Sequence, residues 1–198
     1  PNIGTRPEPT LAAAQPVNVE WPGATPKPAW TWWNPRGKQL VTQWRTTPEM
    51  IDWNNDGLMD LVMLDHEGFL AFFERRRQGD ELQLLPGARV FVDEKGEPLH
   101  LNPRWAGKSG RRKIHFVDAD GDGLRDMLIN STNADLYKNL GTRDGKTALK
   151  NVGPIDERKI SGHTSSPTTI DLNGDGVRDF LIGAEDGYLY YRRNGSEK

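Results

Sequence analysis

Three acidic segments of nine residues have the residue types and spacing of cation-binding loops. Each has Asp or Asn at its first, third and fifth positions, Gly at the sixth and Asp at the ninth. We call them loop 1 (residues 52–60), loop 2 (residues 118–126) and loop 3 (residues 171–179). Side-chain oxygens at alternating positions, followed by a Gly that permits a sharp reversal, can converge on a calcium ion. The sequence therefore predicts three Ca²⁺ sites.

In each loop, four side chains and the backbone carbonyl of the seventh residue would hold the ion. Hard oxygen ligands with three or four carboxylates suit Ca²⁺ better than zinc or copper, and a cage supplied mostly by protein suits it better than Mg²⁺. An acidic turn without metal is the alternative, because Asp, Asn and Gly favour turns by themselves. Three in-register copies favour the metal. The predicted ligands are Asp52, Asn54, Asp56, Leu58 (carbonyl) and Asp60 in loop 1; Asp118, Asp120, Asp122, Leu124 (carbonyl) and Asp126 in loop 2; and Asp171, Asn173, Asp175, Val177 (carbonyl) and Asp179 in loop 3.

The loops belong to a longer repeat of strands and turns. An apolar segment leads into each loop at residues 46–51, 113–117 and 165–170. Continuous apolar runs follow at 61–64, 127–129 and 180–182, as expected of strands buried on both faces. After a turn, a third strand is predicted at 69–73, 136–137 and 188–191. The loops begin 66 and 53 residues apart, which suits a supersecondary unit of about 40 to 50 residues with insertions.

Four antiparallel strands per repeat indicate an all-β fold, a β-propeller built of four-stranded blades. We expect a less regular segment, such as residues 82–92 or 11–19, to form the outer strand. Three blades do not close a ring, because propellers have about four to eight, so we expect flanking blades outside this sequence or self-association. The predicted division is 1–20 (end of a preceding blade), 21–92 (blade with a Trp- and Pro-rich insertion), 93–150 and 151–198. The turn at residues 2–6 repeats the turn at 139–143.

These loops and strands resemble the FG-GAP/VCBS repeat family, which includes blades of integrin α-subunits and of many secreted bacterial proteins. The resemblance covers nearly the whole chain except residues 21–44 and implies a ring that is typically seven-bladed, with calcium between the first two strands of a blade. The sequence letters that name the family are poorly kept, with Gly183-Ala184 as the nearest remnant, so the chain is more similar to the bacterial members. The family hosts lectins, adhesins, lyases and scaffolds, and therefore does not set the activity.

Composition restricts the classes of function and partner. The chain has no Cys, which excludes disulfides and thiolate metal sites. Ten of its 28 acidic residues lie in the three loops; without those ten, the formal charge of −2 becomes +8, which favours anionic partners. Nucleic acid is disfavoured because the basic runs are short and no binding module accompanies them. The sequence has no apolar run of about 18 residues, so it predicts no membrane-spanning helix. Calcium loops of this kind predict an extracellular or periplasmic location.

A ligand is expected on the face opposite the calcium loops, where the loops before strand one and between strands two and three gather. Their Arg, His and Trp side chains would suit an anionic ligand. The Trp residues near position 30 could form a carbohydrate platform, and packing between blades is the alternative. The candidate ligand-binding residues are Trp30, Trp32, Trp33, Trp44, Arg45, His66, Arg111, Arg112 and His163.

Three functions remain open from the sequence. The first is a secreted calcium-binding module that binds a glycan or polysaccharide, possibly anionic. The second is part of a polysaccharide lyase, in which an Arg neutralises a uronate carboxylate and a His or Tyr removes the neighbouring proton. The third is a cell-adhesion or protein-binding scaffold. No catalytic residue is assigned, and His115, in a predicted inner strand, is expected to be a satisfied core residue.

Overall fold

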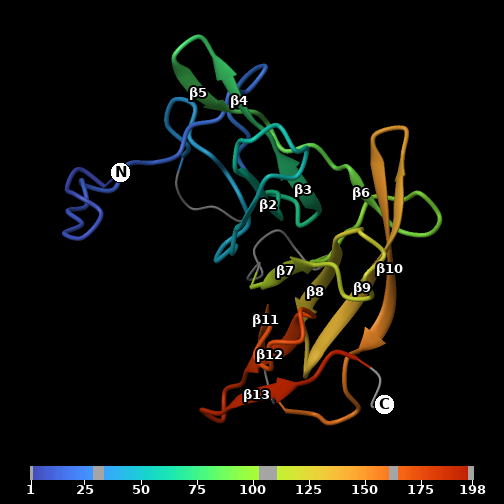
Figure 1. Cartoon of the computed structure of the whole chain (residues 1–198). Coiled ribbons are helices and arrows are strands. Elements are labelled where there is room, and N and C mark those ends of the chain that lie inside the picture. The colour runs from blue at the N-terminus through green and yellow to red at the C-terminus, as the bar shows by residue number, and fades with distance from the viewer. Residues whose placement is uncertain (1, 29–33, 103–110, 161–164, 196–198) are drawn as a thin grey trace.

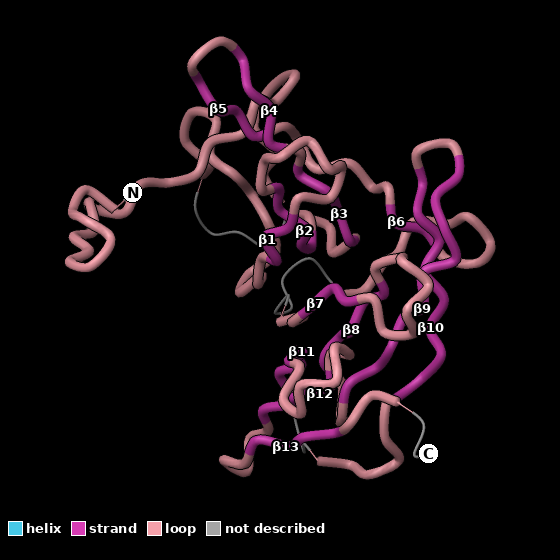
Figure 2. Tube along the Cα trace, in the orientation of Figure 1, coloured by secondary structure: helices cyan, strands magenta, loops and turns pink. Residues whose placement is uncertain are grey.

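The computed structural model describes residues 2–28, 34–102, 111–160 and 165–195 (Figure 1). Within these ranges every regular element is a strand, and Figure 2 shows strands and loops without a helix. Accordingly, none of the described segments is a helix of the length and apolarity needed to cross a membrane. The strands are β1 (Glu49–Ile51), β2 (Asp60–Leu64), β3 (Leu70–Phe73), β4 (Arg75–Gln78), β5 (Glu81–Leu84), β6 (Phe91–Val92), β7 (Ile114–Val117), β8 (Asp126–Asn130), β9 (Ala134–Arg143), β10 (Lys146–Pro154), β11 (Ser166–Ile170), β12 (Asp179–Gly183) and β13 (Leu189–Arg192).

Three sheets share one antiparallel arrangement, β1-β2-β3, β7-β8-β9 and β11-β12-β13. In each, the residue before the acidic loop pairs with the Asp at the ninth loop position. The loop therefore closes the same hairpin three times in the same register, which confirms the predicted strand–loop–strand units. The equivalent pairs are Ile51 with Asp60, Val117 with Asp126, and Ile170 with Asp179.

The outer strands differ from sheet to sheet. In the middle sheet, β10 is a long fourth strand and β6 pairs parallel to it. Among the described residues the first and third sheets have three strands each, and the first sheet has isolated bridges at its edge, which include Phe72 with Ala88 and Phe69 with His100. The segment 82–92, expected as one outer strand, is divided: β5 pairs with β4 in a projecting hairpin, and β6 joins the neighbouring sheet (Figure 1). The cause is Phe91, whose fully buried ring lies in the core that the first two sheets share.

The sheets pack against one another through their apolar middle strands. One cluster joins β2, β3 and β6 to β7 and β8, and a second joins the middle sheet to Phe180 of β12. At the inner side, His115 of β7 links all three first strands. Its Nδ1 lies 2.9 Å from Glu49 Oε1 in β1, and its Nε2 lies 3.0 Å from Thr169 Oγ1 in β11. His115 is therefore a satisfied structural residue, as expected.

The first strands thus lie side by side, and the sheets spread from them as blades do around part of an axis (Figures 1 and 2). The described residues form an arc of three sheets rather than a closed ring. The middle sheet matches a four-stranded blade most fully, with the added parallel strand β6 at its edge.

Candidate metal centre

Each acidic loop reverses direction at two left-handed residues. The Gly at the sixth position has a φ of 85° at Gly57, and the loop 2 and loop 3 equivalents have similar values. The fourth position is also left-handed, with a φ of 60° at Asn55 and 78° at Gly121. The predicted calcium pattern included only the Gly at the sixth position. The signal for the fourth was its occupancy by Asn or Gly, which enter this region most readily.

The first and fifth carboxylates are held by backbone amides of their own loop. In loop 2, Asp118 accepts hydrogen bonds from the N–H groups of Gly121 and Gly123 at 2.8 and 3.0 Å. Asp122 accepts one from Leu124 N–H at 2.8 Å. Loop 3 repeats these contacts, and loop 1 does so except that Asp52 accepts from the N–H of Asp56, the fifth residue, in place of the fourth. The backbone of the turn therefore orients these acidic side chains.

The ninth Asp is buried in every loop, with at most 1% of its surface exposed. In loop 2, Asp126 Oδ2 accepts Ala119 N–H at 3.1 Å and its Oδ1 accepts Asn139 N–H from β9 at 2.7 Å. In loop 1, Asp60 accepts the backbone N–H groups of Trp53 and Arg75. In loop 3, Asp179 accepts the backbone N–H of Asn194 and the hydroxyl of Tyr191. Burial raises the pKa of Asp126, while its two backbone hydrogen bonds oppose the rise. The ninth Asp therefore ties loop 2 to β9, loop 1 to the start of β4, and loop 3 to β13 and the segment after it.

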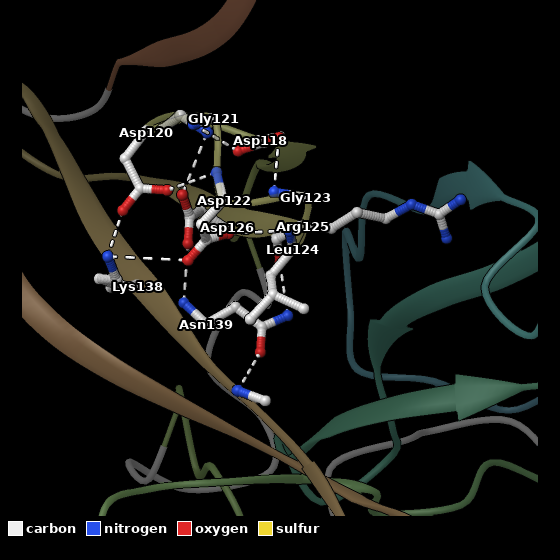
Figure 3. Close-up of polar contacts among 12 residues, drawn as sticks. Asp118, Asp120, Gly121, Asp122, Gly123, Leu124, Arg125, Asp126, Lys138 and Asn139 are labelled. Carbon is white, nitrogen blue, oxygen red and sulfur yellow. Dashed lines mark hydrogen bonds and ion pairs between the residues drawn. The ribbon is translucent and has the colours of Figure 1, made fainter.

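Three carboxylates converge in loop 2 (Figure 3). Asp118, Asp120 and Asp126 each offer one oxygen, and these oxygens lie within 4.8 Å of one another. Oxygens bound at about 2.4 Å on opposite sides of a Ca²⁺ are about 4.8 Å apart, so the spacing fits this ion. It is the one such group of three acidic residues in the described part of the chain. The fourth predicted carboxylate, Asp122, lies outside the group.

At the third position, loops 1 and 3 have an amide where loop 2 has the carboxylate of Asp120. Asn54 Nδ2 donates to Asp56 Oδ2 at 3.0 Å, and Asn173 Nδ2 donates to Asp175 Oδ2 at 3.1 Å. The amide oxygen remains a hard ligand of the type that Ca²⁺ accepts. The donor sets of all three loops are thus compatible with calcium, and loop 2 has the most negative charge.

Two cationic side chains, one in β9 and one directly after β13, reach loops 2 and 3. Lys138 is hydrogen-bonded to Asp120 and lies 3.8 Å from Asp122, and this lysine is the main cause that lowers the pKa of Asp120. Arg193 lies 3.1 Å from Asp175. Asn139 follows Lys138 and Asn194 follows Arg193, and each donates its backbone N–H to the ninth Asp of its loop. In loop 1 the corresponding donor is Arg75. The equivalent of Lys138 and Arg193 in loop 1 is therefore Glu74, an acid, which sequence reasoning did not identify.

The described candidate ligand residues differ in their contacts. Trp44 and Arg45 are exposed neighbours, with Arg45 Cζ 4.1 Å from the Trp44 ring centroid. Arg112 instead donates to the carbonyls of Leu101 and Asn130, so it supports the backbone. Arg111 is exposed and His66 is half-buried. Trp30, Trp32, Trp33 and His163 lie outside the described residues.

A cleft of about 930 Å³ opens between loops 2 and 3, on the face that carries the acidic loops. Phe116 and Val117 form an apolar wall of the cleft, and Asp118 lines it on the side of loop 2. Arg125 and Arg178 also line the cleft. No sequence pattern indicates this cleft, because it depends on how neighbouring sheets meet. Two other Trp residues, Trp21 and Trp53, pack against core clusters.

Comparison with known proteins identified one repeat. Residues 118–182 match a family model described as an FG-GAP-like repeat, which runs from the first Asp of loop 2 into β12. No curated protein and no solved structure matched the chain.

The two kinds of acidic residue in loop 2 should differ in their effect on stability without metal. Asp126→Ala leaves the Ala119 and Asn139 N–H groups without their acceptor, which should cost about 2 to 4 kcal/mol. Asp120→Ala removes a carboxylate that is 40% exposed and should change stability little. Urea unfolding in EDTA measures both. Equal stabilities of the two variants would contradict the structural role of the ninth Asp.

Proposed function

Because the chain carries an FG-GAP-like repeat at residues 118–182, we propose that it is a calcium-binding module of the β-propeller type, with one Ca²⁺ in each loop. Repeats of this family often bind calcium. The observation that carries the proposal is the convergence of Asp118, Asp120 and Asp126 within calcium-ligand distances of one another. The shared register and amide contacts of the other two loops support its extension to them.

In loop 2 the three converging carboxylates, together with the Leu124 carbonyl at the seventh position, would hold the ion. Bound calcium would supply positive charge that offsets the repulsion between these acids. The backbone amides around Asp118 and Asp122 orient the ligands beforehand, which reduces the ordering cost of binding. The role of the metal is therefore structural, and binding and folding are coupled.

The loops are exposed and short, which suits sites filled at the millimolar calcium of extracellular fluid. FG-GAP repeats are typically extracellular. We propose that the chain acts outside the cytoplasm, in the periplasm or the extracellular space.

The proposed ligand is an acidic polysaccharide. An exposed indole at Trp44 can stack on a sugar ring, and the adjacent Arg45 guanidinium can pair with a carboxylate. The lyase alternative requires a free base. His115 does not meet that need because both of its ring nitrogens have partners, which leaves His66 or a tyrosine as the base. A protein-binding scaffold remains the third candidate, and a binding screen separates it from the other two.

Calcium should stabilise the folded chain. At a calcium concentration about ten times the dissociation constant, each site adds about 1.4 kcal/mol. Three sites together should raise the melting temperature by roughly 8 to 16 °C for a chain of this length. Scanning calorimetry in EDTA and in excess calcium tests this, with an equal concentration of magnesium as the control. An unchanged melting temperature in calcium would contradict the proposal.

Removal of the lysine beside loop 2 should tighten its calcium site. Lys138→Gln eliminates a positive charge bonded to Asp120, and we expect roughly threefold to tenfold higher affinity at low ionic strength. The matched control is Lys150→Gln, which breaks a surface ion pair with Glu94 instead. Calorimetric titration measures both variants. Weaker binding by Lys138→Gln would show that the lysine supports the site rather than competing with the ion.

Polysaccharide binding should depend on Trp44. On an array of neutral and uronate-containing polysaccharides, we expect binding to acidic polymers that Trp44→Ala reduces at least tenfold, because the stacking surface is lost. Tyr188→Ala, which removes another exposed aromatic, is the control. Release of unsaturated uronate products during incubation would favour the lyase alternative. Silence across the array would reject the carbohydrate ligand.

A further inference from the structure

Arg125, at the eighth position of loop 2, extends to loop 1. Its Nη1 donates to the carbonyl of Asp52 at 2.7 Å, and its Nη2 donates to Asn55 Oδ1 at 3.3 Å. Its Cζ lies 5.9 Å from the centroid of the Trp53 ring. Figure 3 shows the Arg125 side chain pointing away from the carboxylates of its own loop toward the blue-green ribbon of the first sheet.

The main chain of Arg125 is fixed within loop 2. Its neighbours are Leu124, the predicted carbonyl ligand, and Asp126, one of the three converging carboxylates. Its own carbonyl accepts a hydrogen bond from Asn139 Nδ2 at 3.0 Å. Any ordering of loop 2 by a cation therefore also orders the backbone from which the Arg125 side chain extends.

The residues that Arg125 contacts are those that shape loop 1. Asp52 is the first predicted ligand, and Asn55 is the left-handed residue at the fourth position. Trp53, between them, donates its N–H to Asp60 at 3.0 Å and packs its ring 4.9 Å from that of Phe91. The guanidinium thus holds the segment that must be ordered for loop 1 to close around an ion.

The equivalent residues of the other loops make no such link among the described residues. In loop 3, Arg178 turns back to its own sheet, where its Nη2 donates to Thr169 O at 2.6 Å and its Nε to Thr169 Oγ1 at 2.9 Å. In loop 1 the eighth position is Met59, which has no hydrogen-bonding donor. The arginine connection is therefore specific to loops 1 and 2.

We propose that Arg125 couples the two loops, so that a cation bound in loop 2 raises the affinity of loop 1. The inference rests on the proposed calcium function. An ion in loop 2 fixes Leu124 and Asp126, which places the Arg125 guanidinium on Asp52 and Asn55 and orders part of loop 1 before its own ion arrives. By linkage, an ion in loop 1 raises the affinity of loop 2 by the same factor.

Terbium luminescence can test the coupling at loop 1 specifically. Tb³⁺ replaces calcium at oxygen sites, and Trp53, a residue of loop 1, would transfer excitation energy to an ion bound there. The part of the emission lost in Trp53→Phe identifies the loop 1 signal. The pair Asp120→Asn and Asp122→Asn, made together, removes two charges from loop 2 while keeping oxygen acceptors for the turn.

We expect this loop 2 double substitution to weaken Tb³⁺ binding at loop 1 about fivefold in the otherwise unaltered chain. In Arg125→Met, loop 1 should already bind about fivefold more weakly, and the loop 2 substitutions should then have no further effect. Arg178→Met, the matched control, should retain the full coupling. Arg125→Lys keeps the charge but cannot span both acceptors, so it should lose the coupling too, and it serves if Arg125→Met does not fold.

Two results would overturn the coupling but not the calcium function. The first is a Tb³⁺ affinity of loop 1 that the loop 2 substitutions do not change. The second is a pair of affinity losses, from Arg125→Met and from the loop 2 substitutions, that are additive. Tighter Tb³⁺ binding in Arg125→Met would also overturn it, because simple charge repulsion would then be the dominant effect. A complete lack of Trp53-sensitised emission in the unaltered chain would instead reject the proposed calcium function, and the coupling with it.

Discussion

The structure depends most on a buried carboxylate that serves two backbone segments at once. In each loop the ninth Asp accepts an N–H group from the third strand or from just beyond its end, and in loops 1 and 2 it also accepts one from the start of the loop. A buried carboxylate is costly unless it is well hydrogen-bonded, so the hairpin and the third strand must come together in one register. The repeat recurs because this single interaction recurs, with Asp60, Asp126 and Asp179.

The same carboxylate links architecture to chemistry. Asp126 holds β9 against loop 2. One of its carboxylate oxygens also lies within 4.8 Å of carboxylate oxygens of Asp118 and Asp120, a spacing that a shared Ca²⁺ could span. A cation at that point would bind to a residue that is already fixed by the fold. The neighbouring charges differ between loops, with Lys138 beside loop 2, Arg193 beside loop 3 and Glu74 at the equivalent place in loop 1. Three loops of one pattern therefore meet three different electrostatic environments.

The sequence was sufficient to predict those strands and loops that the local residue pattern determines. The apolar runs and turn residues located the first three strands of every sheet, and the Asp spacing located the loops between strands one and two. It was insufficient where distant packing decides. Phe91 joins β6 to the neighbouring sheet because its ring is buried between two sheets, and Arg112 supports carbonyls rather than facing a ligand. Arg125 gave no signal either, since its partners lie about seventy residues earlier in the chain.

The most direct measurement of the central claim is a crystal structure of the chain grown in millimolar calcium, with anomalous diffraction to locate the ions. The account predicts an anomalous peak in each loop, and in loop 2 oxygens of Asp118, Asp120 and Asp126 at about 2.4 Å from the ion. Loops without anomalous density, with Lys138 still bonded to Asp120, would contradict it.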